Sequence, residues 1–65
     1  MVIIEESEVR IINYIKLKSI ENSVIVIVMK KMIYEISGED LTIGFYDRNE
    51  IKIKGKLKGI KVIYE

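Results

Sequence analysis

The sequence has no cysteine and no histidine, and these two absences exclude several classes of protein. A disulfide framework is impossible, and the familiar zinc sites are excluded because they are built from cysteine and histidine ligands. The same two side chains are the commonest catalytic nucleophiles and general acids or bases. We therefore expect a protein that is not an enzyme and that holds no metal.

Long apolar runs and a glycine-rich loop are missing as well. No apolar run approaches the ~20 residues that cross a membrane, and residues 1–8 lack the basic start and apolar segment of a secretory signal. We therefore expect a cytoplasmic protein without a transmembrane segment. No phosphate-binding loop and no cofactor are predicted, because the glycines are dispersed at expected turns and phase breaks: Gly38, Gly44, Gly55 and Gly59.

The 65 residues predict one domain, residues 1–65, near the lower limit for independent folding. With 49% hydrophobic and 32% charged residues, the composition is typical of a folded domain. Since disulfides and zinc are excluded, oligomerisation is the reinforcement that remains for so small a domain. A net charge of +1 predicts no general attraction to nucleic acid, which we do not expect to be the partner.

Alternation of apolar and polar residues predicts an all-β domain, because helical spacing never persists for two turns. We expect an antiparallel meander of about six short strands that forms a small sandwich or barrel, with a short β-solenoid as the alternative. The expected strands cover residues 2–4, 9–17, 24–29, 32–37, 41–46 and 51–64, with turns at 21–22, 30–31, 37–40 and 47–50.

Three local features of this pattern carry further expectations. The pair Lys30-Lys31 has no glycine or asparagine for a primed turn, so either a strained turn or a bend without reversal is expected. Gly59 shifts the apolar phase, as a bulge or a second turn would. The segment Ile36-x-Gly38 recurs as Ile53-x-Gly55, which indicates two similar hairpins rather than stacked solenoid rungs.

Six consecutive apolar residues, 24–29, dominate the middle of the chain and place apolar side chains on both faces of one strand. Burying one such side chain contributes about 1.5 to 3 kcal/mol. If one face stayed exposed to water, the lost free energy of burial would be comparable with the net stability of a whole domain, ~5 to 15 kcal/mol. We therefore predict a homo-oligomer or a docked partner. The expected interaction residues are Val24, Ile25, Val26, Ile27, Val28, Met29 and Ile33.

A row of lysines forms the second candidate site, on one face of the strand after residue 50: Lys52, Lys54, Lys56 and Lys58. Their spacing of two residues predicts a positive stripe about 20 Å long. The row is either an anion-binding stripe or a solvated, edge-protecting face, and we favour the second because no aromatic residues are interleaved with it. The acidic residues of the turns, among them Glu39 and Asp40, lack the spacing of a calcium loop.

The run YEISGEDLTIGFYDRNEIKIKGKLKGIKVIYE resembles the carboxyl half of the YabP/YqfC family of sporulation proteins. The family pattern, Ile-x-Gly-x-x-Leu-x-Ile, an acidic turn and Ile-x-Ile-x-Gly-x-Ile-x-x-Ile, falls on Ile36, Gly38, Leu41, Ile43, Ile51, Ile53, Gly55, Leu57 and Ile60. The upstream VRIINYIKLKSIENSVIVIV is similar to the family's first hairpin, most closely in the YqfC branch. The resemblance implies a protein of the mother cell in a sporulating bacterium, with a membrane protein encoded alongside as its partner, and no catalytic residues.

The sequence thus favours a non-catalytic, sporulation-associated structural or interaction protein that acts by self-association or by docking on a partner protein. One alternative is a small β-barrel that binds nucleic acid or acidic lipid through the lysine row. Another is a small inhibitor that occludes the surface of a second protein.

Overall fold

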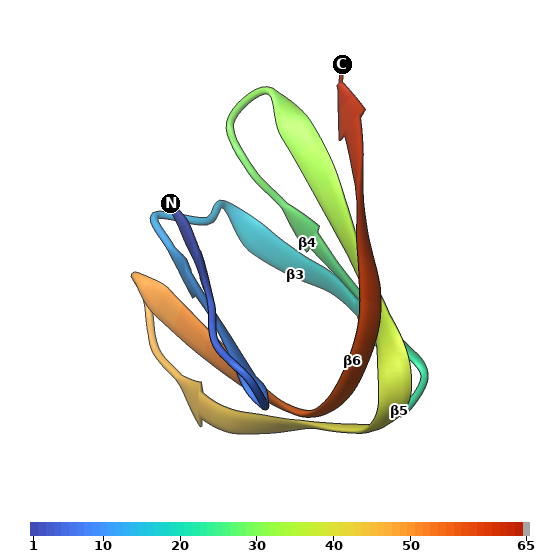
Figure 1. The fold of residues 1–65 in the computed structure, drawn as a ribbon. Coiled ribbons are helices and arrows are strands. Elements are labelled where there is room, and N and C mark those ends of the chain that lie inside the picture. The colour runs from blue at the N-terminus through green and yellow to red at the C-terminus, as the bar shows by residue number, and fades with distance from the viewer. Residues whose placement is uncertain (65) are drawn as a thin grey trace.

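A computed structural model describes residues 1–64, which form six β-strands and no helix (Figure 1). This confirms the all-β, antiparallel prediction; Glu65 lies outside the described residues. The strands are β1 (Val2–Ile4), β2 (Glu8–Ile12), β3 (Lys16–Ile20), β4 (Val24–Val28), β5 (Met32–Tyr46) and β6 (Glu50–Tyr64). Four of them are short, whereas β5 and β6 each have 15 residues.

All six strands belong to one antiparallel sheet with the order β1-β2-β6-β5-β4-β3. Strands β3 to β6 follow one another as the expected meander. The β1–β2 hairpin does not continue beside β3 but pairs through β2 with the other side of β6. Within the described residues the sheet does not close into a barrel or form a solenoid; it folds over on itself.

Sharp bends in the middle of β5 and β6 divide the sheet into two layers (Figure 1). The β3–β4 layer contains β3, β4, residues 32–37 of β5 and residues 59–64 of β6. The β1–β2 layer contains β1, β2, residues 42–46 of β5 and residues 50–54 of β6. The long hairpin therefore contributes to both layers, and each short hairpin extends one of them.

Glycine is required at both bends because a neighbouring backbone passes too close for a side chain. A Cβ on Gly38 would lie 2.2 Å from the carbonyl oxygen of Lys56, and a Cβ on Gly55 would lie 2.7 Å from that of Asp40. Gly55 also has a φ of +137°, a conformation that is nearly confined to glycine. Asp40 has a φ of +52°, so the bend of β5 also contains a left-handed residue.

The turns of the two short hairpins hold these bends in equivalent ways. The Gly38 N–H donates to the Ser23 carbonyl at 3.0 Å, and the Gly55 N–H donates to the Ser7 carbonyl at 3.3 Å. The repeated Ile-x-Gly segments are thus matching bends in the two strands of one hairpin. The expectation of two similar hairpins was wrong, because both segments pair within β5–β6.

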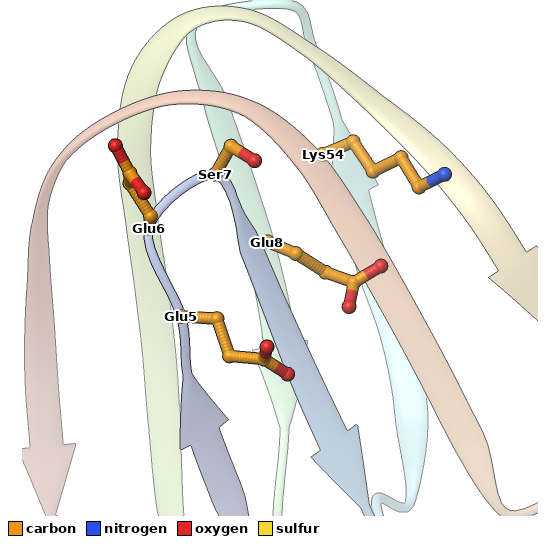
Figure 2. Close-up of a pocket in the computed structure, with 5 residues that line it drawn as sticks. All are labelled: Glu5, Glu6, Ser7, Glu8 and Lys54. Carbon is orange, nitrogen blue, oxygen red and sulfur yellow. The ribbon is translucent and has the colours of Figure 1, made fainter.

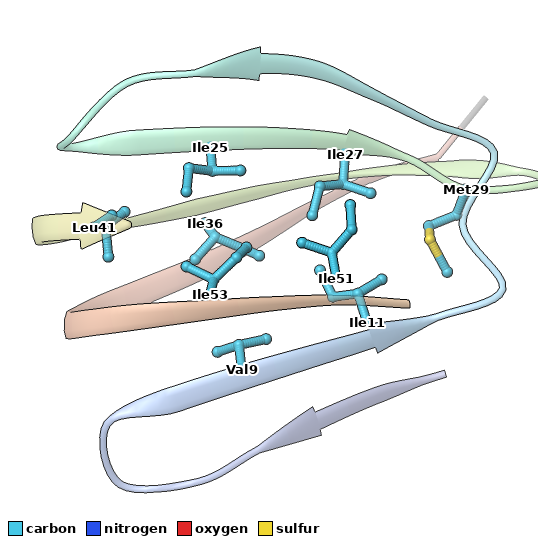
Figure 3. Packing of buried hydrophobic residues seen from close by; sticks show 9 residues of the cluster. All are labelled: Val9, Ile11, Ile25, Ile27, Met29, Ile36, Leu41, Ile51 and Ile53. Atoms are coloured by element: carbon cyan, nitrogen blue, oxygen red, sulfur yellow. The ribbon is translucent and has the colours of Figure 1, made fainter. Parts of the chain in front are cut away.

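Nine hydrophobic residues are buried between the layers: Val9, Ile11, Ile25, Ile27, Met29, Ile36, Leu41, Ile51 and Ile53. In Figure 3, Ile25 and Ile27 extend from β4 toward the opposite layer, where Val9 of β2 faces them. Leu41 and Met29 lie toward opposite ends of the cluster. Because seven of the nine are isoleucine or valine, the β-branched residues that favour strands also fill the core.

Two predicted boundaries were wrong. Residues 9–17 are not one strand, because Asn13 adopts a φ of +65° and ends β2, and the chain crosses to the other layer before β3 begins. Ile15 consequently lies 60% exposed rather than in the core. Residues 37–40 do not form a turn, since β5 continues through them with shifted register.

The structure confirms the polar turn at residues 47–50 and chooses between the alternatives predicted at residues 30–31 and at Gly59. The Met29 N–H donates to the Met32 carbonyl, so the chain reverses at residues 30–31. Of the bulge and the second turn expected at Gly59, the structure has the bulge. Gly59 pairs with Ser37 while Leu57 pairs with Gly38, so Lys58 is the extra residue. At residues 47–50, the Asp47 carboxylate accepts two backbone N–H bonds at 2.8 Å, as expected for a polar reversal.

Candidate interaction surface

Strand β4 divides its apolar side chains between the core and the outer surface of the β3–β4 layer. Ile25 and Ile27 are fully buried, and Met29, just beyond the strand, is 8% exposed. These three residues belong to the chain's own core and are removed from the interaction surface predicted from the sequence. The alternate residues of β4 point the other way and are only half-buried.

An apolar area, called the outer patch, covers this outer surface. It consists of Val24, Val26, Val28, Ile33 and Ile63. The register places Val28 opposite Ile33 and Ile33 opposite Ile63, so one row of apolar side chains crosses three strands. Ile63 is 37% exposed, and no described residue covers the patch, because the core lies on the opposite side of these strands.

Polar side chains border the outer patch and carry both signs of charge. Glu35 of β5 pairs across the sheet with Val26 on one side and with Lys61 on the other. Lys16 of β3 lies opposite Val28. The face therefore presents apolar side chains next to a carboxylate and two ammonium groups, a composition typical of a protein interface with a polar rim.

The lysine row lies on β6, where its residues Lys52, Lys54, Lys56 and Lys58 extend over the bend. Acidic residues neutralise much of it. Lys54 lies opposite Glu8 of β2, and Lys56 lies opposite Glu39 of β5. The Nζ of Lys58 is 2.7 Å from the Glu39 carboxylate. This pairing favours a solvated, charge-balanced surface over an anion-binding stripe.

A hollow of about 320 Å³ beside the β1–β2 turn is lined by Glu5, Glu6, Ser7, Glu8 and Lys54. In Figure 2, the Glu6 side chain points away from those of Glu5 and Glu8, and the Lys54 amine extends away from the Glu6 carboxylate. The charged groups do not converge on a common point. Among residues 1–64, no group of three potential metal ligands is close enough to hold an ion.

Two of the described ionisable side chains, those of Arg10 and Tyr14, have a shifted pKa. Arg10 donates to the Glu50 carboxylate at 2.6 Å, and this hydrogen bond is the main cause that raises the pKa of Arg10. No polar or charged residue within 1–64 is buried. The arrangement thus gives no acid, base or nucleophile that is both desolvated and paired with a second reactive group.

Tyr14 lies where the chain crosses between the layers, and its ionisation should make the free energy of unfolding depend on pH. Its ring lies 6.2 Å from that of Tyr46, and its hydroxyl donates to the Asp47 carbonyl. Partial burial first, and the Tyr46 phenol second, raise the pKa of Tyr14 above its ordinary value of 10.0. A raised pKa in the folded state favours the neutral phenol, so its stabilisation is complete below pH ~10 and is lost as pH rises through the folded pKa.

We expect the wild-type unfolding midpoint to fall above pH ~10, with a delayed phenolate absorbance for one tyrosine. Tyr14→Phe should remove both the delayed phenolate signal and part of this alkaline decline. Absorbance titration and denaturant unfolding at several pH values measure the two effects. An unchanged alkaline profile in Tyr14→Phe would contradict this role.

Sequence reasoning missed two functional candidates that lie on the second half of β6. Ile63 belongs to the outer patch, although it is 30 residues distant in sequence from Ile33, its partner across the sheet. The edge of β6 beyond Gly55 has no strand beside it among the described residues. The alternation of Ile60, Val62 and Tyr64 predicted a strand there, but strand order, which sequence periodicity does not reveal, decides which edges stay unpaired.

Within residues 1–64 there is no helix long and apolar enough to span a membrane. No family model, curated protein or solved structure matches the chain.

Proposed function

We propose that the protein is a non-catalytic interaction module that self-associates through the outer patch. The observation that carries this proposal is the row of Val28, Ile33 and Ile63, three apolar side chains in register on a surface that no other described strand covers. A contiguous exposed apolar area with a polar rim is typical of a protein interface. Two copies that pack these faces together form a second sheet-on-sheet interface outside the core.

Charge on the same face supports a second copy as the occupant. Glu35 and Lys61 lie side by side, and Lys16 borders the patch on the β3 side. A face that carries both signs is able to match a rotated copy of itself, with Glu35 of one protomer near Lys16 or Lys61 of its partner. A partner of uniform charge would meet repulsion at one of these positions.

The area of the face limits the strength of this contact. Four strands of five residues cover about 19 by 17 Å, roughly 320 Å² per copy. Two copies then bury on the order of 650 Å², about half of the lower value for a stable specific interface. Face pairing alone should therefore give weak association, in the micromolar range or above.

A role in sporulation rests on the family resemblance alone. On that basis we propose a role in the mother cell of a sporulating bacterium and a membrane protein as a further partner. The residues that carry the resemblance serve the fold: Ile36, Leu41 and Ile53 are core residues, and Gly38 and Gly55 form the bends. The alternative of an anionic partner on the lysine row has less support, because carboxylates face that row.

Val26→Lys tests the outer patch. The Val26 side chain points away from the core, so we expect the variant to fold, with the new ammonium group opposite Glu35. We expect it to lose face pairing, since each contact would have to bury this charge from both copies. Sedimentation equilibrium of the variant should give a lower mass than that of wild type at the same micromolar concentration.

Ile12→Lys is the matched control. It places the same charge on the outer surface of the β1–β2 layer, opposite Glu50, and should leave the mass unchanged. An equal mass for Val26→Lys and wild type, with both proteins folded, would reject the outer patch as an interface.

A further inference from the structure

Among residues 1–64, no strand pairs with one backbone edge of the second half of β6. Strand β2 pairs with β6 from Glu50 to Lys54, and the Gly55 N–H bonds to the β1–β2 turn. From there to Tyr64, β5 is the one described strand that pairs with β6. The last six pairs, from Ser37–Gly59 to Met32–Tyr64, follow without a register shift. This part of β6 is therefore a long and regular edge.

The other three edges of the two layers carry features that discourage strand addition. Strand β1 has three residues, and β3 has a register shift between Leu17 and Ser19 together with two lysines. The second half of β5 has a register shift between Ile43 and Phe45. Short length, bulges and lysines are the usual means by which edge strands avoid pairing. After Gly59 the β6 edge has no register shift and one lysine, Lys61, and its exposed large hydrophobic residues are Val62 at 36%, Ile63 at 37% and Tyr64 at 76%.

The ladder identifies which backbone groups of this edge point outward. The bonds from Gly38 to Ser23 and from Met29 to Met32 flank the β4–β5 ladder, so Tyr34 and Ile36 bond toward β4. Alternate residues of β5 then bond toward β6, where their partners include Lys61 and Ile63. The residues between these partners have N–H and C=O groups that face away from β5: Ile60, Val62 and Tyr64.

We propose that this edge pairs with the same edge of a second copy, antiparallel and centred on Val62. Val62 then lies opposite Val62 of the partner, and Ile60 lies opposite the partner's Tyr64. All three outward-facing residues exchange N–H···O=C bonds in both directions, which makes about six bonds between the copies. A register centred on Lys61 would place two ammonium groups directly opposite each other and is disfavoured.

Edge pairing deepens the proposed self-association, on which it rests. The two-fold axis between the edges is perpendicular to the sheet, so both outer patches lie on the same side of one continuous eight-stranded layer. Two such pairs that pack face to face bury on the order of 1,300 Å², twice the area available to two single copies and within the range of specific interfaces. The expected assembly is therefore a tetramer built from two kinds of contact.

Val62→Pro separates the edge from the face. Proline removes the outward N–H of Val62 and is tolerated at edge positions whose N–H does not bond within the sheet. In concentrated solution we expect wild type to be a tetramer, with four times the 7.6 kDa mass of one chain. We expect Val62→Pro to be a dimer, with twice the mass of one chain. Val62→Ala, which shortens the same side chain but keeps the N–H, should remain a tetramer.

Amide hydrogen exchange of the wild type provides a readout that needs no variant. The amides of Ile60, Val62 and Tyr64 should exchange more slowly as concentration rises, whereas those of the unpaired β5 edge should not. Equal masses for Val62→Pro and Val62→Ala, or rapid exchange of these three amides in the assembled protein, would overturn edge pairing. A tetramer that Val62→Pro halves but Val26→Lys leaves intact would instead reject the outer patch and retain the edge.

Discussion

Gly55→Ala is expected to unfold the protein at room temperature. The new Cβ would lie 2.7 Å from the Asp40 carbonyl oxygen and 3.0 Å from that of Glu39, and the φ of +137° is unfavourable for alanine. Strain of this kind costs about 1 to 3 kcal/mol before the backbone clash is added. A 65-residue domain has roughly 3 to 10 kcal/mol of stability, so circular dichroism should show loss of most strand signal.

Gly59→Ala is the control for this substitution. A Cβ at Gly59 meets its nearest atom, the Ser37 hydroxyl oxygen, at 3.5 Å, which is an ordinary contact. The control should keep the wild-type spectrum and shift the urea midpoint little. Equal stability of the two variants would show that the bend of β6 does not require glycine.

Ile27→Thr is expected to cost about 3 kcal/mol or more, the second large effect. Ile27 is fully buried between the layers, and threonine would remove part of its hydrocarbon volume and bury a hydroxyl group. Val26→Thr introduces the same residue one position earlier on the outer face and should change the unfolding free energy of the dissociated chain by less than about 1 kcal/mol. Urea unfolding of both variants at low protein concentration measures the difference.

Similar losses for the two threonine variants would contradict the division of β4 into a buried face and an outer face. A larger loss for Val26→Thr, seen at high concentration alone, would instead report the loss of association.

Local periodicity was sufficient to predict the strands because each strand has one face in the core. Ile51 and Ile53 are buried while Lys52 and Lys54 between and beside them face outward, as the alternation predicted. The Asp47 turn was equally predictable, since its carboxylate caps backbone groups two and three residues ahead. These features depend on neighbours in the sequence.

The bends could not be predicted in the same way, because their cause lies in a distant strand. Gly38 resembles a turn residue in sequence, but its glycine is required by the Lys56 carbonyl, which β6 brings to it. Asn13 is a local exception, since asparagine tolerates the positive φ that ends β2. The apolar residues around Asn13 made a single long strand look continuous.

The candidate surface was half predictable for a similar reason. A strand with apolar residues on both faces indicated that something must cover each face, but periodicity does not say which face meets the core. In the structure, the side chains of Ile25 and Ile27 point into the core, and those of Val24, Val26 and Val28 point outward. Ile63 joined them through pairing with Ile33, a contact that depends on the whole β5–β6 hairpin.

The pairing of β2 with β6 also bears on the order of folding. Val9 pairs with Ile53 across most of the chain, whereas β3 to β6 are linked by short turns between consecutive strands. Loop-closure entropy makes such a distant pairing slow relative to local hairpins. We therefore expect the four-stranded meander to form before the β1–β2 hairpin docks, with the β2-side edge of β6 from Glu50 to Lys54 unpaired in the meantime. Docking of that hairpin is the late step that completes the core.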